Sequence, residues 1–282
     1  MATDRIRSAC IVGWPVEHSR SPLIHNYWLK HYGIAGQYRR EAVPPGQFAD
    51  FLKNLPARGY VGANVTVPHK EAALALSQPD DRARAVGAAN TFWFDGGSLR
   101  STNTDVEGFL DSLDAGAPGW ERGVAKAVVL GAGGAARAVV YGLVLRGIAN
   151  VTVVNRTADR VALFSERFGK GVRAAEWDKR DALLADAGLL VNATTLGMDH
   201  QPGLALDIGR LPSDTIVADL VYAPLVTPLL RAAKARGLRT ADGLEMLLYQ
   251  AVRGFALWFG RTPEVTGELR ALVKADLAGD KE

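Results

Sequence analysis

The segment of residues 126–160 constrains the fold of this 282-residue chain more than any other part. It reads KAVVLGAGGAARAVVYGLVLRGIANVTVVNRTADR, an apolar run followed by a glycine-rich turn, a helical stretch and a second apolar run. Ala127–Leu130 is apolar throughout, as expected for a parallel strand buried on both faces. The turn fills a G-x-G-x-x-A pattern, whose small residues permit a tight turn, close approach of a pyrophosphate and close helix–strand packing. The segment therefore predicts a Rossmann-type, dinucleotide-binding domain, with the phosphates at the N-terminus of a helix from about Ala135 to Arg146.

The end of the second strand, Val151–Asn155, indicates which dinucleotide is bound. Domains that bind NAD usually carry Asp or Glu about 20 residues past the glycines, where it holds the ribose 2′-hydroxyl. Here Asn155 and Arg156 take that place, and Thr157 is suited to cap a helix that has Arg160 in its first turn. A cation there opposes the helix dipole unless a phosphate lies between the two arginines. The pattern favours NADP, and two solvated surface arginines are the alternative.

Composition excludes several other classes of function. The chain is 48% hydrophobic and 22% charged, which describes an ordinary globular protein. Its net charge of +3 comes without a basic stripe or a recognition motif, so we expect no nucleic-acid partner. The five histidines show no metal-binding spacing, and no segment approaches about 18 consecutive apolar residues. We therefore expect no metal and no membrane partner, a cytoplasmic location, and Cys10 as a small core residue.

The order of strand and helix patterns predicts an α/β fold with two domains. We expect residues 1–107 and 243–282 to form a substrate-binding and catalytic domain, because the last two helices return to the first domain. Residues 108–242 are expected to form the NADP-binding Rossmann domain. A cleft between the two domains is the expected substrate site. In the first domain we expect strands at Ser8–Gly13, Gln37–Val43 and Tyr60–Pro68, helices from Pro22 and over Phe48–Leu55, and a hairpin around Gly96-Gly97.

Lys70, in NVTVPHK, is the strongest candidate for chemistry in the first domain. Pro68 suits the first turn of a helix, which puts Lys70 close behind it against the unfavourable end of the dipole. A structural lysine gains nothing there, whereas a catalytic lysine does, because the dipole helps to lower its pKa toward a working range. A solvated lysine on a polar helix face is the alternative.

Other polar residues lie at element ends, and each also has a structural explanation. Asp105 can be the N-cap of a helix beginning at Val106 or a ligand, and Asn90 can be a turn residue. Ser19 and Ser21 lie beside a helix N-terminus that suits a carboxylate, although Ser21 also suits a simple N-cap. Gln250 is polar within an apolar helix, where a core glutamine is the alternative.

Taken in order, the motifs SRSP, NVTVPHK, GAANT, NTD, GAGGAAR, NRTxxR, NAT, DLVYxPLxTPLL and ADGLEMLLYQA resemble shikimate dehydrogenase from about Gly13 to Gln250. The resemblance implies NADP-dependent interconversion of 3-dehydroshikimate and shikimate in aromatic amino-acid biosynthesis, with Lys70 as acid–base residue and Asp105 as its partner. It implies that the substrate is bound by Ser19, Ser21, Thr66, Lys70, Asn90, Asp105, Tyr222 and Gln250. It implies that the cofactor is contacted by Asp81, Gly131, Ala132, Gly133, Gly134, Ala135, Asn155, Arg156, Thr157, Arg160, Leu220 and Gly243.

Three residues depart from the family pattern, namely Trp14, Thr195 and Leu220, and they put fine specificity in doubt without touching Lys70 or Asp105. A quinate/shikimate dehydrogenase paralogue is one alternative. A non-catalytic ligand sensor is another, although such a protein is expected to lose Lys70 or Asp105. We expect a monomer or a homodimer.

Overall fold

The computed structural model describes residues 6–279, apart from the side chains of residues 158–161. The chain divides into two compact units. The first comprises the chain up to Thr104 together with Gln250–Val273, and the second comprises Asp105–Tyr249 together with the chain from Lys274. The division therefore falls inside helix α9 (Gly243–Phe259). The two-domain α/β class is confirmed, and the domain boundaries drawn from the sequence stay a prediction.

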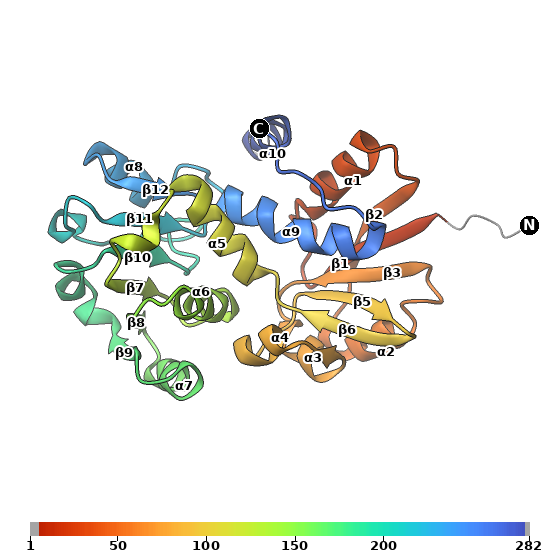
Figure 1. The fold of residues 1–282 in the computed structure, drawn as a ribbon, viewed down its shortest axis with the longest axis horizontal. Helices are drawn as coiled ribbons and strands as arrows, with labels where there is room; N and C mark the ends of the chain where they lie inside the picture. Colours follow the sequence, from red (N-terminus) through yellow and green to blue (C-terminus); the bar gives the residue numbers. More distant parts are fainter. Residues whose placement is uncertain (1–5, 280–282) are drawn as a thin grey trace, which may run out of the picture. The chain divides into compact units, whose positions relative to one another are not determined.

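The first unit contains a six-stranded mixed sheet in the order β2-β1-β3-β5-β6-β4. β1 pairs in parallel with β2 and β3, whereas β5 pairs antiparallel with β3 and with β6, the hairpin expected around Gly96-Gly97 (Figure 1). The parallel part places the carboxyl ends of β1, β2 and β3 at one edge. The strands are β1 (Arg7–Gly13), β2 (Gly36–Ala42), β3 (Tyr60–Val65), β4 (Gln78–Pro79), β5 (Thr91–Asp95) and β6 (Ser98–Thr102).

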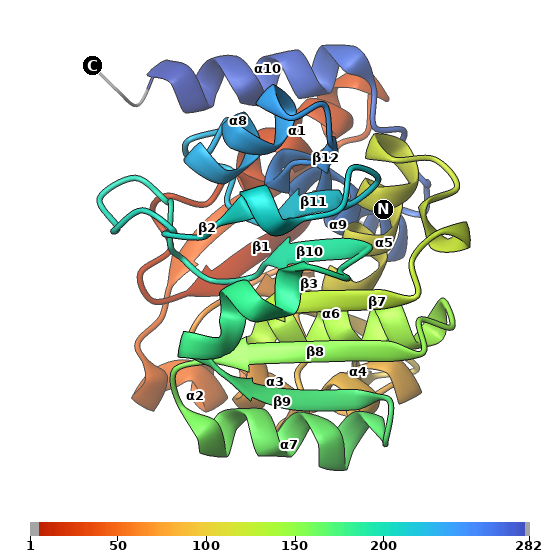
Figure 2. The same ribbon diagram turned by 90° about the vertical axis from the view of Figure 1, so that its left-hand side faces the viewer.

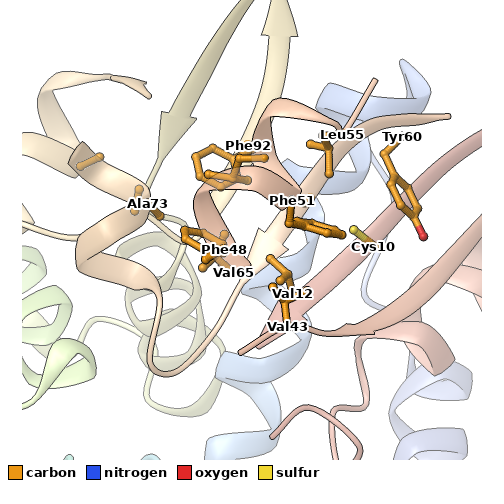
Figure 3. Packing of buried hydrophobic residues seen from close by; sticks show 14 residues of the cluster. Cys10, Val12, Val43, Phe48, Phe51, Leu55, Tyr60, Val65, Ala73 and Phe92 are labelled. Carbon is orange, nitrogen blue, oxygen red and sulfur yellow. The ribbon is translucent and has the colours of Figure 1, made fainter. Parts of the chain in front are cut away.

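Apolar side chains pack helices onto both faces of this sheet. On one face, Phe48 and Phe51 lie against Cys10, Val12 and Val65 (Figure 3). Cys10 is fully buried, which confirms the expected core position. The helices of this unit are α1 (Ser21–His31), α2 (Phe48–Lys53), α3 (Lys70–Ala75), α4 (Asp81–Val86), the second half of α9, and the start of α10 (Gly267–Gly279), with a 3-10 turn η1 (Pro45–Gln47).

Aromatic side chains of α1 and α9 cover the opposite face. His25 of α1 stacks on Tyr38 of β2 with ring centroids 4.1 Å apart, and Trp28 meets Phe255 of α9 edge-on at 5.4 Å. The indole of Trp258 donates to the carbonyl of Phe92 at 2.7 Å. This layer joins the second half of α9 to the sheet of the first unit.

Three local expectations were wrong at the ends of helices. Ser21 is the first residue of α1 and not its N-cap, because the amide of Ser21 instead donates to the hydroxyl of Ser19 at 3.3 Å. Pro68 lies in a turn, since β3 ends at Val65 and α3 begins only at Lys70. Asp105 is the first residue of helix α5 (Asp105–Gly116) and not the cap before it. Lys70 and Asp105 therefore both lie at a helix N-terminus.

The second unit contains an all-parallel sheet in the order β12-β11-β10-β7-β8-β9 (Figure 2). The chain starts at the central strand β7, runs outward through β8 and β9, and returns to β10 on the other side of β7. This reversal between β7 and β10 is the switch point at which Rossmann-type sheets bind a dinucleotide. The strands are β7 (Lys126–Leu130), β8 (Asn150–Asn155), β9 (Val172–Glu176), β10 (Leu189–Asn192), β11 (Ile216–Asp219) and β12 (Arg239–Ala241).

Three helices of the second unit, α6 (Gly134–Leu145), α7 (Ala158–Phe168) and α8 (Pro228–Ala235), lie between successive strands, as crossover connections between parallel strands require. The unit also contains α5, the first half of α9 and the end of α10, with 3-10 segments η2 (Trp120–Arg122), η3 (Trp177–Leu184) and η4 (Ile208–Arg210). A core of Val128, Leu190, Val217, Leu229 and Leu230 packs α8 onto the sheet. Within residues 6–279, no helix is long and apolar enough to cross a membrane.

Candidate functional site

The turn between β7 and α6 fits a bound pyrophosphate. Gly131 has a φ of +105°, and a Cβ added there would lie 2.9 Å from the carbonyl oxygen of Ala193, so a side chain is excluded. Gly133 is the exposed N-cap residue of α6 and offers no side chain to block its first amides. Those amides and the positive end of the helix dipole lie at this turn, where they favour the binding of an anion. The predicted contacts Gly131, Ala132, Gly133, Gly134 and Ala135 all lie in this turn or the first residues of α6.

The end of β8 carries the residues predicted to select NADP. Asn155 is half-buried and its side-chain amide donates to the carbonyl of Thr157 at 3.3 Å. Arg156 is exposed directly after the strand. Thr157 occupies the N-cap position of α7, as predicted, although its hydroxyl makes no capping hydrogen bond. The side chain of Arg160 lies outside the described residues.

A buried carboxylate, Asp219, holds together the carboxyl ends of β10 and β11. Its Oδ1 accepts from the amide of Asn192 at 2.9 Å and from the backbone N–H of Val221 at 3.1 Å, and its Oδ2 accepts from the Thr227 hydroxyl at 2.6 Å. Burial raises the pKa of Asp219 to about 6, and these three donors offset part of the rise. Thr227 also caps α8, because its hydroxyl accepts from the amide of Leu230 at 3.2 Å.

The Asp219 network fixes the segment that contains Leu220 and Tyr222. The amide of Leu220 donates to the carbonyl of Asn192 at 2.9 Å. Gly243, at the start of α9, packs so closely that a Cβ there would lie 2.4 Å from the carbonyl oxygen of Leu220. Two predicted cofactor contacts, Leu220 and Gly243, thus lie side by side, and Tyr222 follows half-buried in the same segment.

In the first unit, Thr66 and Lys70 lie just past the carboxyl end of β3. A Cβ on Gly13, the last residue of β1, would lie 2.4 Å from the methyl group of Thr66, so only glycine permits this approach. His69 precedes Lys70, is buried, and stacks on Phe48 with centroids 4.3 Å apart. A ring nitrogen of His69 also lies 2.7 Å from the carbonyl oxygen of Val43. These contacts hold the N-terminus of α3, and Lys70 on it is half-buried.

Asn90 connects the α3 region to the end of β6. The amide of Ala89 donates to the carbonyl of Lys70 at 2.9 Å, and the amide of Asn90 donates to the carbonyl of Thr102 at 3.0 Å. The side-chain oxygen of Asn90 accepts from the backbone N–H of Thr104 at 2.8 Å. Asp105 follows Thr104 and is buried, as is Asn90.

The remaining predicted substrate ligands lie at the start of α1 and within α9. The guanidinium of Arg40 donates to the carbonyl of Ser19 at 2.7 Å and 3.1 Å, which anchors the loop before α1. Ser21 is buried and Gln250 is half-buried. Asp81 lies in the first turn of α4, is exposed and lies 3.9 Å from Arg84. The structure thus places Ser19, Ser21, Thr66, Lys70, Asn90 and Gln250 in the first unit, and Asp105, Tyr222 and the cofactor contacts other than Asp81 in the second.

Comparison with known proteins places the chain in a family. Models of the shikimate dehydrogenase substrate binding domain, of shikimate / quinate 5-dehydrogenase and of the shikimate 5'-dehydrogenase C-terminal domain match residues 11–92, 121–197 and 243–271. A protein of Rhodopseudomonas palustris (strain HaA2) named shikimate dehydrogenase (NADP(+)) is 63% identical over 275 residues, 98% of either chain. The chain belongs to the shikimate dehydrogenase family.

Relatives and solved structures support this membership over the whole length. Shikimate dehydrogenase (NADP(+)) of Nitrobacter winogradskyi is 61% identical over 96% of this chain and 97% of that protein. The Thermus thermophilus shikimate 5-dehydrogenase in complex with NADP(H) and shikimate is 37% identical, with a TM-score of 0.82 over 97% of this chain and 99% of that chain. Quinate dehydrogenase from Corynebacterium glutamicum in complex with NAD is 31% identical, with a TM-score of 0.89 over 95% and 99%.

Several polar residues of this shikimate dehydrogenase family member were missed from the sequence. Asn192 and Asp219 form the network of the second unit together with Thr227, and Asn64 and Tyr38 form hydrogen bonds in the first. The available signal was their position, because Asn64, Asn192 and Asp219 are polar residues at the carboxyl ends of otherwise apolar strands. Among the described residues, no group of three or more His, Cys, Asp or Glu side chains could hold a metal ion.

Proposed function

We propose that this chain catalyses the reversible reduction of 3-dehydroshikimate to shikimate with NADPH. The observation that carries the proposal is the arrangement around Asn90. Hydrogen bonds from Ala89 to Lys70 and from Thr104 to Asn90 bring the start of α3 and the residue before Asp105 to one strand end. An acid–base residue and a carboxylate can therefore meet at a site made of polar, hydroxyl-binding groups.

Bound NADPH would supply a hydride to the carbonyl carbon of the substrate. The residues of this chain would bind and orient the substrate and transfer the proton. The Lys70 ammonium donates a proton to the oxygen of the former ketone, and in the reverse direction a neutral Lys70 takes a proton from the hydroxyl. Asp105, at the N-terminus of α5, is the carboxylate that would orient the Lys70 side chain.

The other predicted ligands match the chemistry of a hydroxylated carboxylic acid. Ser19 and Ser21, at the start of α1, are suited to the carboxylate, as is Tyr222. Thr66, Asn90 and Gln250 offer hydroxyl and amide groups for the ring hydroxyls. The turn Gly131–Gly133, exposed at Gly133, would hold the pyrophosphate of NADP, and Arg156 with Arg160 would bind its 2′-phosphate.

This activity makes shikimate, and we place it accordingly in aromatic amino-acid biosynthesis. The relatives named shikimate dehydrogenase (NADP(+)) support that placement. The proposal includes a cytoplasmic enzyme that acts as a monomer or a homodimer on a small-molecule substrate.

A steady-state assay with two substrates and two cofactors tests the proposal. The purified chain is supplied with shikimate or quinate, each with NADP or NAD, and formation of the reduced cofactor is followed by absorbance. We expect the highest kcat/KM for shikimate with NADP. No turnover of shikimate with either cofactor would contradict the proposal.

A quinate-oxidising activity is the second candidate function. The observation that favours it is the fold similarity to the quinate dehydrogenase of Corynebacterium glutamicum. In the same assay, a kcat/KM for quinate equal to or above that for shikimate would favour this second function.

A further inference from the structure

A continuous chain of buried hydrogen bonds runs through the first unit from Tyr38 to Asn90. The phenol oxygen of Tyr38 lies 2.6 Å from Oδ1 of Asn64. Nδ2 of Asn64 lies 3.0 Å from the hydroxyl of Thr91, which lies 3.0 Å from Oδ1 of Asn90. All four residues are at most 3% exposed, so water cannot replace one link without opening the core.

One backbone amide fixes the direction of every bond in this chain. The N–H of Thr104 can only donate, so the atom of Asn90 that it meets at 2.8 Å must be the oxygen. The hydroxyl of Thr91 donates its proton to the same oxygen of Asn90. It therefore accepts a hydrogen bond from Nδ2 of Asn64. Asn64 then presents its oxygen to the phenol, and the single proton of Tyr38 goes to that oxygen.

The same polarity determines what Asn90 offers at its end of the chain. The amide of Asn90 is held with its oxygen toward Thr104, so that its NH₂ group is directed the opposite way. A side-chain amide without such a lock can turn over and present the wrong group to a ligand.

We propose that Tyr38 is a positioning residue of the substrate site. Its hydroxyl locks the chain that holds Asn90 as a hydrogen-bond donor toward a substrate oxygen. The inference rests on the proposed function, because it takes Asn90 as a ligand of the substrate. It also assigns a chemical preference: the group at Asn90 must be an oxygen that accepts a hydrogen bond, such as a hydroxyl or a ketone.

Tyr38→Phe tests this role because it removes the hydroxyl and keeps the ring that stacks on His25. The loss of one buried hydrogen bond predicts an increase of roughly three- to tenfold in the KM for shikimate. The KM for NADP should stay unchanged, since Tyr38 lies in the first unit. Tyr60→Phe is the matched control, because Tyr60 is also buried in the same unit. Its hydroxyl bonds to Glu41, which is not part of this chain of hydrogen bonds. We expect no change in either KM for the control.

A double-mutant cycle separates positioning from a general loss of stability. If Tyr38 acts through Asn90, Tyr38→Phe should have little further effect on the KM for shikimate in an Asn90→Ala enzyme. If Tyr38→Phe does not fold, Thr91→Val breaks the same chain at another link and should give the same rise in KM. If the wild-type enzyme is active, an unchanged KM for shikimate in these variants would overturn this inference and leave the proposed function standing. Additive effects in the double-mutant cycle would do the same. A wild-type enzyme inactive with shikimate would overturn the proposed function as well.

Discussion

The backbone N–H of Thr104 donates a hydrogen bond to Oδ1 of Asn90, with the two atoms 2.8 Å apart. The next residue along the chain is Asp105, and the residue before Asn90 donates its amide to the carbonyl of Lys70. Two short links thus connect the neighbourhood of Lys70 with the residue that precedes Asp105. This is the physical reason to expect Lys70 and Asp105 to act together in catalysis.

Asp105→Asn should lower kcat substantially. The substitution keeps the shape of the side chain and removes its charge, so that Lys70 loses the carboxylate proposed to orient it. Adding Lys70→Ala should cost much less than the sum of the two single effects, as for residues that act together. Asp111→Asn, on the exposed side of α5, is the control and should leave kcat unchanged.

Full additivity in that cycle would contradict the pairing. Asp105 would then act as a helix-terminal or substrate-binding carboxylate that does not influence Lys70.

Arg156→Ala combined with Arg160→Ala should raise the KM for NADP strongly and leave the KM for NAD nearly unchanged. A charge-assisted hydrogen bond contributes about 1.5–3 kcal/mol, so two such bonds give NADP a preference on the order of 10²-fold or more. Arg173→Ala is the control, because Arg173 is an exposed arginine on β9 of the same unit. Equal losses for both cofactors would mean that Arg156 and Arg160 support the fold and do not bind the 2′-phosphate.

His25 should make the protein less stable in acid. Burial lowers the pKa of His25 from 6.5 to about 3, with a smaller opposing effect of Asn64. Because the folded-state pKa is depressed, the unfolded chain takes up a proton at His25 at a higher pH than the folded protein does. The stability that neutral His25 contributes is therefore present above pH 6.5 and is lost as the pH falls toward 3. Between pH 7 and pH 5 this amounts to about 2 kcal/mol of unfolding free energy.

His25→Phe should remove that acid loss and keep the aromatic packing. Urea unfolding at pH 7 and pH 5 measures it, and His18→Gln, at an exposed position, is the control that should behave as wild type. If His25→Phe and the wild type lost the same unfolding free energy between pH 7 and pH 5, the conclusion that His25 is buried in its neutral form would be contradicted.

Much of the fold could be predicted from the sequence because local signals agreed with one another. The apolar run of β7, its glycines and the parallel partner β8 predicted the dinucleotide unit, and the all-parallel sheet confirms it. The hairpin around Gly96-Gly97 also followed from local chemistry. Helix ends were less predictable: Ser21 lost its capping role because the Ser19 hydroxyl accepts its amide.

The polar networks could not be predicted because they join residues far apart in the sequence. Tyr38 meets Asn64, and Asn192 meets Asp219, only after strands from different parts of the chain have paired. The residue types alone gave no indication, since Asn64 and Asp219 also suit turns. Site residues that matched family motifs, such as Lys70 and Asn90, could be named from the sequence, but the direction of the hydrogen bonds that hold them required the structure.

The kcat of Lys70→Ala in the reduction of 3-dehydroshikimate by NADPH is the measurement that tests the account most directly. Removal of the acid–base residue should lower kcat by roughly 10²–10⁴, with a smaller effect on the KM for the substrate. Lys53→Ala, an exposed lysine of the same unit that lies 3.7 Å from Asp50, should retain wild-type kcat. A Lys70→Ala enzyme with at least a tenth of wild-type kcat would contradict the assigned role.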